Sequence, residues 1–371
     1  NLKDLLKTLT KYKIELISSG GTYKEIKKLK FKCLEVSEYT NSPEILGGRV
    51  KTLHPKIHAG ILSKRNNRSH KTDLKNNNFE EIDLVIVNFY PFEKTLEETN
   101  DHKKIVENID VGGPTMVRAA AKNYNDVTVI TSSNQYDELI TEIDKNNGST
   151  SLRFREKMSL EAFSETAYYD AVISNYFNKV QNNNFPKKKI FYGNLIEKLR
   201  YGENPHQEAG IYSKTSDLNI KQIHGKLLSY NNYNDIFSAL TISKSLPRNS
   251  GTVIVKHANP CGVSIHKNNL KSYQLALACD PISAFGGIVS CNFKITKTLA
   301  LKLKNIFLEV IISNGFDPEA LKILKKKKNL RLIDASTFMM NSLIKFNSAN
   351  DTILTQSEDL KAFNIKDFKI V

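Results

Sequence analysis

Short apolar runs that alternate with helical patterns dominate the first half of the chain. The runs DLVIVNFY (83–90) and DVTVITS (126–132) are continuous rather than alternating in hydrophobicity, as in strands that are buried on both faces. The helical pattern PTMVRAAAK (114–122) separates them. Buried strands that are connected through helices are typical of a mostly parallel sheet with both faces covered. The first half is therefore predicted to be an α/β domain.

The second half mixes strands and helices again. The predicted strands include GTVIVKHA (251–258) and GGIVSCNF (286–293), and LKSYQLALAC (270–279) has a helical pattern. Between the halves, the helical pattern of residues 159–177 is followed by NKVQNNNFPKKK (178–189), a polar segment with a proline and a charge run. We therefore predict two α/β domains, residues 1–184 and residues 185–371, with a boundary near residue 185.

Composition limits the functional classes that the chain can belong to. Lysine and arginine number 54 against 39 aspartates and glutamates, which gives a formal net charge of +15 and permits anionic partners. The excess lysines are scattered among asparagines rather than gathered with aromatic residues in a stripe, so no nucleic-acid partner is predicted. No run of 18 apolar residues is present, so no membrane span is predicted, and a cytoplasmic location is expected. The cysteines lack CxxC spacing, so neither a thiolate zinc site nor a disulfide framework is predicted.

A glycine-rich turn between a strand and a helix is predicted in ELISSGGTYKEI (15–26). Glycines permit a sharp turn and a close approach of ligand, and the first N–H groups of a helix attract anions. The residues that could hold a phosphate here are Ser18, Ser19, Gly20, Gly21 and Thr22. The alternative is a purely structural strand–turn–helix connection, in which Thr22 only supports the helix start.

A basic segment follows in GGRVKTLHPKIHAGIL (47–62). Arg49 and Lys51 are two residues apart and would point to the same side of an extended backbone, which suits a phosphate or a carboxylate. His54 and His58 have the spacing of a helical metal pair, but Pro55 disfavours helix at His54 and no HExxH acid is present, so no metal is predicted. The alternative is a basic loop with one packed histidine.

Two further segments of the first half place polar residues at ends of predicted elements. In IDVGGPTMVRAAAKN (109–123), an acid and two glycines precede a helix with Pro114 at its first position, and Arg118 and Lys122 share one face. In IDLVIVNFYPF (82–92), Asn88 and Tyr90 follow the strand at its carboxyl end, where ligands of parallel sheets gather. For residues 109–123 the alternative is a solvent-exposed basic helix face beside packed alanines. For residues 82–92 it is a tyrosine that only covers the core.

One apolar strand of the second half runs directly into a lysine and a histidine, in VIVKHANPCGV (253–263). Lys256 can stabilise a developing oxyanion and His257 can move a proton near neutral pH, so the pair suits acyl-type transfer. The polar loops LRYGENPHQ (199–207), SYNNYND (229–235) and DPISAFGGIVS (280–290) are predicted to line the same cleft. Cys261 is an alternative nucleophile, but a buried thiol explains it more simply.

Taken in order, these segments resemble the bifunctional purine-biosynthesis enzymes with AICAR transformylase and IMP cyclohydrolase activities. The resemblance rests on ISSGGT, GGRVKTLHPKIHAGIL, DLVIVNFYPF, ENIDVGGPTMVRAAAKN, LRYGENPHQ, VIVKHANPCG and DPISAFGGIV, and it extends over essentially all 371 residues. It implies an N-terminal methylglyoxal-synthase-like domain with a parallel sheet. A partial cytidine-deaminase-like α/β transformylase domain without zinc would follow.

The resemblance also implies roles for individual residues. In the cyclohydrolase domain the expected catalytic residues are Lys51, Tyr90, Asp110 and Lys122, and the expected substrate-binding residues are Ser18, Ser19, Gly20, Gly21, Thr22, Arg49, Thr52, Asn88, Gly112, Gly113, Thr115 and Arg118. In the transformylase domain the expected catalytic residues are Lys256 and His257, and the expected substrate-binding residues are Arg200, Tyr201, Asn231, Ser283, Phe285, Gly286 and Glu309.

The implied activity is formyl transfer from 10-formyltetrahydrofolate to AICAR, followed by dehydrative closure of the formylated nucleotide, FAICAR, to IMP. 10-Formyltetrahydrofolate is the expected co-substrate, no metal is expected, and the family forms homodimers that share the transformylase site across their interface. The family's first strand, with a Ser-x-Ser-Asp-Lys motif, is expected before Asn1, and a Lys-Ser-Asn segment is expected after Val371. A monofunctional anion-binding α/β enzyme is the alternative, and it would explain the first domain only. A nucleic-acid-binding module would explain the charge alone.

Overall fold

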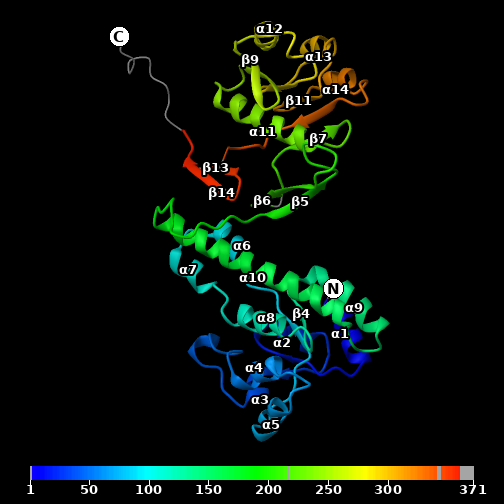
Figure 1. Cartoon of the computed structure of the whole chain (residues 1–371), viewed down its shortest axis with the longest axis vertical. Coiled ribbons are helices and arrows are strands. Elements are labelled where there is room, and N and C mark those ends of the chain that lie inside the picture. The colour runs from blue at the N-terminus through cyan, green and yellow to red at the C-terminus, as the bar shows by residue number, and fades with distance from the viewer. Residues whose placement is uncertain (1, 216, 341–343, 360–371) are drawn as a thin grey trace. The chain divides into compact units, whose positions relative to one another are not determined.

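The structure is a computed structural model, and it describes residues 2–215, 217–340 and 344–359. The chain divides between Phe191 and Tyr192 into two compact units, called unit 1 and unit 2 (Figure 1). The predicted boundary near residue 185 lies in the polar segment just before this division. Both units combine helices with parallel strands, which confirms the predicted α/β class. The predicted second domain continues to residue 371, and residues 360–371 lie outside the described part of the chain.

Two pairs of parallel strands lie in unit 1. β1 (Ile17–Ser18) pairs with β2 (Leu34–Glu35), and β3 (Leu84–Ile86) pairs with β4 (Thr128–Ile130). The parallel direction agrees with the prediction from the continuous apolar runs. The strands are shorter than those runs, and among the described residues each strand has a single hydrogen-bonded neighbour. The ends of each run therefore continue as loops, and these loops carry the predicted site residues.

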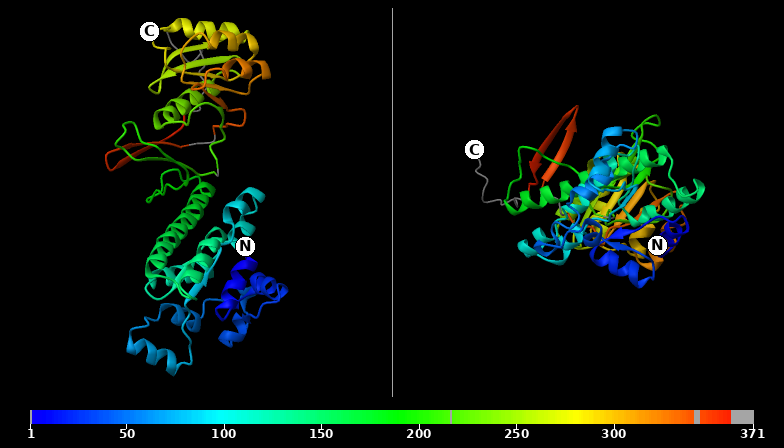
Figure 2. Two further views of the ribbon diagram at one scale, coloured as in Figure 1. Left: turned by 90° about the vertical axis from the view of Figure 1, so that its right-hand side faces the viewer. Right: turned by 90° about the horizontal axis from the view of Figure 1, so that it is seen from below.

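Helices surround these strands. They are α1 (Leu2–Lys11), α2 (Gly20–Lys28), α3 (Val36–Thr40), α4 (Pro55–Leu62), α5 (Arg68–Asn76), α6 (Phe92–Glu98), α7 (His102–Glu107), α8 (Gly112–Lys122), α9 (Tyr136–Lys145) and α10 (Leu152–Val180), with the 3-10 turns η1 (Leu46–Gly48) and η2 (Ser133–Gln135). The long helix α10 is drawn in green in Figure 2. No helix in the described ranges is both long and apolar enough to cross a membrane.

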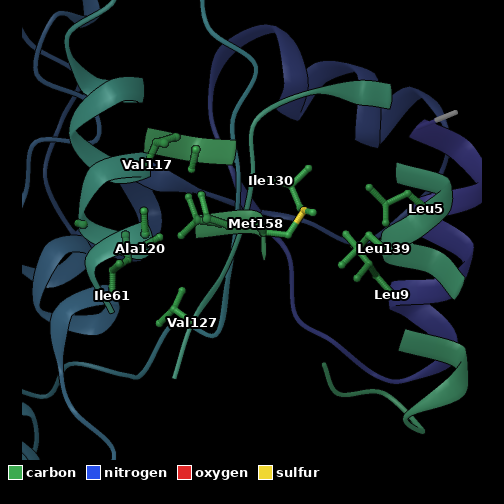
Figure 3. Close-up of a cluster of buried hydrophobic side chains, with 14 of the residues drawn as sticks. Leu5, Leu9, Ile61, Val117, Ala120, Val127, Ile130, Leu139 and Met158 are labelled. Carbon is green, nitrogen blue, oxygen red and sulfur yellow. The ribbon is translucent and has the colours of Figure 1, made fainter. Parts of the chain in front are cut away.

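The core of unit 1 is built where α8 and α10 pack on β4. Figure 3 shows Met158 of α10 beside Ile130 of β4, with side chains of α4 and α8 on one side and side chains of α1 and α9 on the other. Met158 is fully buried, which stabilises the fold by about 1.5–3 kcal/mol. The Ser159 hydroxyl donates a hydrogen bond to the Ala121 carbonyl at 2.8 Å. These contacts hold α8 firmly, and the first turn of α8 belongs to the candidate site.

Unit 2 contains a mixed sheet with the strand order β7-β12-β11-β10-β8-β9. Its strands are β7 (Lys221–His224), β8 (Gly251–Lys256), β9 (Asn259–Ile265), β10 (Ile288–Cys291), β11 (Val310–Ser313) and β12 (Arg331–Asp334). β10, β11 and β12 are parallel, and β8 runs antiparallel to β10. The sheet therefore ends, on one side, in the β8–β9 hairpin that presents Lys256 and His257.

Helices cover both faces of this sheet. α11 (Tyr230–Ser245) packs on the face that carries Val253 and Val255. On the other face, where Ile254 points, lie α12 (Asn269–Cys279), α13 (Lys297–Leu303) and α14 (Pro318–Leu324). Consecutive strand residues alternate between the faces, so the apolar run of β8 supplies both cores. The hairpins β5 (Asn194–Leu199)–β6 (Ala209–Ser213) and β13 (Ile344–Ala349)–β14 (Thr352–Ser357) complete the unit.

Candidate active sites

The glycine turn before α2 and the basic segment after η1 lie together in unit 1. Gly20 has a φ of +56°, and a Cβ at this position would lie 3.4 Å from Lys51 Nζ. The Lys51 ammonium also lies 2.8 Å from Glu44 Oε1. In the described structure the Ser19 side chain does not cap α2, so the first N–H groups of this helix remain available to an anion. A cation and a helix N-terminus therefore converge at residues 18–22.

Thr52 connects this corner to the N-terminus of α8. A Cβ on Gly112 would lie 2.5 Å from Thr52 Oγ1, so only glycine allows this approach. Earlier in the same basic segment, Arg49 forms an ion pair with Glu107 of α7, with Arg49 Nε 3.2 Å from Glu107 Oε1. The backbone at Arg49 is helical rather than extended, with φ −63° and ψ −21°. Arg49 and Lys51 therefore reach different carboxylates, in contrast to the common direction expected of an extended segment.

Asp110 lies at the start of α8 and is half-buried. Its carboxylate accepts a hydrogen bond from the Gly113 N–H at 2.9 Å and another from the Tyr90 backbone. Burial raises the pKa of Asp110, and these hydrogen bonds partly oppose the rise. The Asp110 N–H donates to the Tyr169 hydroxyl at 2.9 Å. A carboxyl group with a raised pKa suits proton transfer. Tyr169, which lies on α10, was not among the site residues predicted from the sequence.

The helix that follows Asp110 begins earlier than predicted. α8 starts at Gly112, so Pro114 is its third residue and not its first. Asp110 makes this possible because its carboxylate accepts the N–H of Gly113 at the helix start. Proline remains compatible with the first turn, where N–H groups have no partner within the helix.

Two cavities lie beside the carboxyl ends of β3 and β4. One, of about 670 Å³, is lined by Thr22, Asn88 and Ser133, among others, and the second, of about 470 Å³, by Asn88, Tyr90, Ser133 and Tyr169, among others. Asn88 therefore lies between them, and its amide donates to the Tyr136 hydroxyl at 3.1 Å. Thr22 lines the first cavity, Tyr90 lines the second, and Asn88 borders both.

The remaining predicted residues of α8 point elsewhere. The Thr115 hydroxyl donates to the Val111 carbonyl at 2.7 Å. The Arg118 guanidinium lies over the Phe163 ring of α10, 5.7 Å from its centroid. Lys122 is the last residue of α8, which places it about 15 Å along the helix axis from Gly112. Arg118 and Lys122 are therefore not brought together with Asp110.

The two histidines of the basic segment have separate environments. The His54 ring accepts a hydrogen bond from the Lys56 N–H at 3.1 Å and thereby caps α4. Burial lowers the pKa of His58. No group of three or more histidine, cysteine, aspartate or glutamate side chains in the described ranges is arranged to hold a metal. His54 therefore caps the helix start, and His58 lies half-buried on α4.

In unit 2, Lys256 contacts the Phe-Gly-Gly turn that precedes β10. Lys256 Nζ donates to the Phe285 carbonyl at 3.0 Å. A Cβ on Gly287 would lie 2.9 Å from the Val255 carbonyl, so this turn packs closely on the end of β8. Gly286 has a φ of +75°, which favours glycine there. The predicted residues Lys256, Phe285 and Gly286 are therefore adjacent, and Ser283 lies in the same turn with its N–H bonded to Asp280 at 2.9 Å.

His257 and Ala258 form the two-residue turn between β8 and β9. Their φ angles are +52° and +60°, and Lys256 pairs with Asn259 across the turn. The Ala258 N–H donates to Asp235 Oδ1 at 2.7 Å, and the Asn259 amide donates to the His257 carbonyl at 2.8 Å. His257 is exposed at the tip. Asp235 lies in the segment SYNNYND, which was predicted to line the cleft, but it was not singled out there.

The structure connects Asn232, rather than Asn231, to the predicted residue Glu309. Asn232 is buried, and its amide donates to Glu309 Oε2 at 2.9 Å. Asn231 is exposed on α11. Ser229 and Asn232 form a capping box, and this pattern of a serine followed three residues later by a polar residue is the sequence signal that indicates Asn232. The Glu309 carboxylate also lies 3.6 Å from Arg331.

Arg200 and Tyr201 follow β5, and the Arg200 guanidinium lies 5.7 Å from the centroid of the Tyr201 ring. β5 is joined to α11 through the Tyr233 hydroxyl, which donates to Glu197 Oε2 at 3.0 Å. Cys261 is half-buried, and burial raises the pKa of its thiol. A raised thiol pKa opposes nucleophilic activation, which agrees with the reading of Cys261 as a packed residue.

Comparisons with known proteins cover both units. Residues 120–371 match the family described as AICARFT/IMPCHase bienzyme, and residues 1–115 match the MGS-like domain. Among curated proteins named bifunctional purine biosynthesis protein PurH, that of Prochlorococcus marinus subsp. pastoris is 46% identical over 337 residues, which cover 88% of this chain and 65% of that protein. The chain thus spans less than two thirds of the length of this relative.

Two further relatives of the same name match over the whole chain. The protein of Lactobacillus acidophilus is 42% identical over 379 aligned residues, covering 100% of this chain and 74% of that protein. The protein of Bradyrhizobium diazoefficiens is 41% identical, covering 100% of this chain and 71% of that protein. Among solved structures, the crystal structure of ForH is 27% identical, covers 47% of this chain and 92% of that chain, and has a TM-score of 0.43.

Proposed function

Because the chain belongs to the AICARFT/IMPCHase bienzyme family, we propose that it is an enzyme of purine biosynthesis with two activities. Unit 2 would transfer a formyl group from 10-formyltetrahydrofolate to AICAR, and unit 1 would close the product, FAICAR, to IMP. The predicted domains 1–184 and 185–371 are assigned to cyclisation and transfer, respectively. The observation that carries the proposal is the approach of Lys51 to Gly20 and of Thr52 to Gly112, which gathers a cation and two helix N-termini around one loop.

Ring closure needs positioning more than covalent catalysis. The carboxamide nitrogen of FAICAR attacks the formyl carbon of the same molecule, a new N–C bond forms, and the formyl oxygen leaves as water after proton transfer. Lys51 and the start of α2 are proposed to hold the 5′-phosphate. Asp110, whose pKa is raised by burial, is proposed to move a proton beside Tyr90. Holding both reacting groups in one geometry supplies much of the rate acceleration.

Formyl transfer requires removal of a proton from a weakly basic amine. The 5-amino group of AICAR attacks the formyl carbon, the bond between this carbon and N10 of the folate breaks, and N10 takes up a proton. His257 is proposed to accept the proton of the amine, and Lys256, fixed by the Phe285 carbonyl, to stabilise the oxyanion. Phe285, Gly286, Ser283 and Glu309 border this site, and Arg200, Tyr201 and Asn231 remain proposed substrate contacts.

The proposed chemistry uses imidazole, ammonium and carboxylate groups, so no resident metal is included. 10-Formyltetrahydrofolate is the proposed co-substrate, and AICAR, FAICAR and IMP are the proposed nucleotide ligands. We further propose a homodimer in the cytoplasm, without a nucleic-acid or membrane partner. Size determination in solution tests the dimer.

The two activities can be measured separately on one preparation. Conversion of FAICAR to IMP, without folate, tests unit 1, and production of FAICAR from AICAR and 10-formyltetrahydrofolate tests unit 2. Loss of a general base or of a positioned charge costs typically about 10²–10⁴-fold in rate. We expect K51A to impair cyclisation alone and H257A to impair formyl transfer alone. If both variants impaired both reactions equally, the assignment of one activity to each unit would be wrong.

A further inference from the structure

We propose that Asp235 is a positioning residue for formyl transfer, because it holds the His257–Ala258 turn in the conformation that presents the imidazole. The inference rests on the proposed transferase function of unit 2. Asp235 itself does not contact the reacting groups in this assignment. It bonds to the backbone of Ala258, one residue beyond His257, with Oδ1 2.7 Å from the amide nitrogen.

The turn is built from residues that disfavour its backbone conformation. Both His257 and Ala258 have φ in the left-handed region, at +52° and +60°. Two-residue hairpins with positive φ at both central positions are usually made of Asn-Gly or similar pairs, which adopt this region readily. Side chains with a Cβ crowd the backbone there, and alanine has no polar group that compensates. Histidine occurs at positive φ more often than most residues with a Cβ, so the strain of this turn lies mainly at Ala258.

Contacts from outside the hairpin must therefore hold this turn. The Ala258 N–H donates to a carboxylate, and hydrogen bonds with one charged partner are stronger than neutral ones. The second contact is internal to the hairpin, from the Asn259 amide to the His257 carbonyl at 2.8 Å. Asp235 is thus the residue through which the neighbouring helix fixes the tip of the hairpin.

Asp235 is itself on a rigid element. α11 packs on the sheet through Ile236 and Ala239, which are fully buried, and it starts in the capping box of Ser229 and Asn232. The same packing surface includes Val253 and Val255 of β8. The helix and the strand that leads to His257 therefore share one core, and Asp235 completes the connection at the strand's end. Because the helix is rigid, a group attached to it can hold the turn, and with it the His257 imidazole, in one position.

The substitution D235A removes the acceptor and leaves the strained turn free to relax. A displacement of about 1 Å of a catalytic group can lower a rate by roughly 100-fold. We therefore expect D235A to lower kcat of formyl transfer by roughly 10- to 100-fold, with a smaller change in KM for AICAR. D235N keeps an oxygen acceptor and should recover most of the activity. The double variant D235A/A258G should recover part of it, because glycine adopts positive φ without strain.

Two controls separate positioning from general damage. The matched control is T241A, which removes an exposed side chain of the same helix, outside the segment predicted to line the cleft. Cyclisation of FAICAR by unit 1 serves as the internal control. Formyl transfer by the control variant and cyclisation by D235A should both proceed at the wild-type rates. In ¹⁵N-labelled protein, the Ala258 amide should exchange with solvent faster in D235A than in the wild type, which tests the hydrogen bond without any substrate.

The outcomes distinguish this inference from the proposed function. If wild-type protein makes no FAICAR, the transferase proposal fails and the role of Asp235 fails with it. If the wild type is active and D235A retains full kcat, the inference alone is overturned. Equal loss in D235A and D235N without recovery by A258G would mean that the charge acts directly on the reaction, which also overturns a positioning role. Should D235A not fold, D235N decides the question, because its neutral acceptor is weaker than a carboxylate. A fall in kcat should then accompany faster exchange of the Ala258 amide, and a fall in kcat with unchanged exchange would overturn the inference.

Discussion

The backbone N–H of Asp110 donates to the Tyr169 hydroxyl at 2.9 Å, so the long helix α10 holds the residue that precedes the first turn of α8. Tyr169 is buried against Phe89, with ring centroids 5.1 Å apart. The aromatic contact fixes the tyrosine ring, and the ring fixes the Asp110 backbone. The orientation of the Asp110 carboxylate therefore depends on a helix that lies much further along the chain.

Replacement of Tyr169 by phenylalanine removes the acceptor of the Asp110 N–H. An unsatisfied buried donor costs about 1–3 kcal/mol, and we expect unit 1 to lose this much stability in denaturant unfolding. The kcat of FAICAR cyclisation should fall by roughly 10- to 100-fold, while formyl transfer is unchanged. Y168F is the matched control, because the Tyr168 hydroxyl bonds to Glu93 at the surface. Equal effects of Y169F and Y168F on cyclisation would contradict the prediction.

Gly20 is expected to be sensitive to substitution because Lys51 lies against it. In G20A the new Cβ would lie 3.4 Å from Lys51 Nζ, at a position where φ is +56°. We expect kcat/KM for FAICAR to fall by roughly 10-fold, because the added methyl group occupies space beside the Lys51 ammonium where the phosphate is proposed to bind. G47A provides the comparison, since Gly47 shares a left-handed φ of +63° but has open space around the position of its Cβ. Both variants should lose about 1–2 kcal/mol from backbone strain, and only G20A should lose activity.

Asp110 should make the stability of unit 1 fall as the pH rises. Burial raises its folded-state pKa above the unfolded value of about 3.9. Between these two pKa values the folded state binds more protons than the unfolded state, so the free energy of unfolding decreases with increasing pH. D110N removes this contribution. We expect the urea midpoint of D110N minus that of the wild type to be larger at about pH 7 than at about pH 3.5. A difference independent of pH would argue against a raised pKa.

The two neighbouring asparagines of α11 should behave differently. N232A removes the amide that bonds to Glu309 at 2.9 Å and the acceptor for the Ser229 N–H, and we expect a loss of about 1–3 kcal/mol in the stability of unit 2. N231A removes an exposed side chain and should leave stability unchanged. If Asn231 contacts substrate as proposed, N231A raises KM for AICAR. Thermal unfolding and steady-state kinetics on both variants measure these effects.

Several of the elements that carry the site residues were predictable from local sequence. The apolar run before Lys256 predicts a strand, and β8 ends at that lysine. The alanine run after Pro114 predicts a helix, and α8 contains it. The glycine pair after Ser19 predicts a turn, and Gly20 has the positive φ that glycine permits. These features depend on propensities and steric limits that act within a few residues.

The start of α8, the separate directions of Arg49 and Lys51, and the bond between Asn232 and Glu309 were not predicted. The start of α8 depends on a local hydrogen bond from the Gly113 N–H to the Asp110 carboxylate. The other two depend on a partner that is distant in the sequence or on backbone geometry that a neighbouring element imposes. Arg49 turns to Glu107 of α7, and Asn232 reaches Glu309 after β10. Pattern reading cannot supply such partners, because it shows which face a side chain occupies but not what packs against that face.

The amino-acid sequence by itself determined the α/β class and the family. The tertiary structure alone decided that Lys51 lies against Gly20 and that Asp235 bonds to the backbone beside His257. The physical reason is that strand, helix and turn preferences are short-range. The meeting of two side chains from different elements is fixed only when the layers pack and bury their shared core.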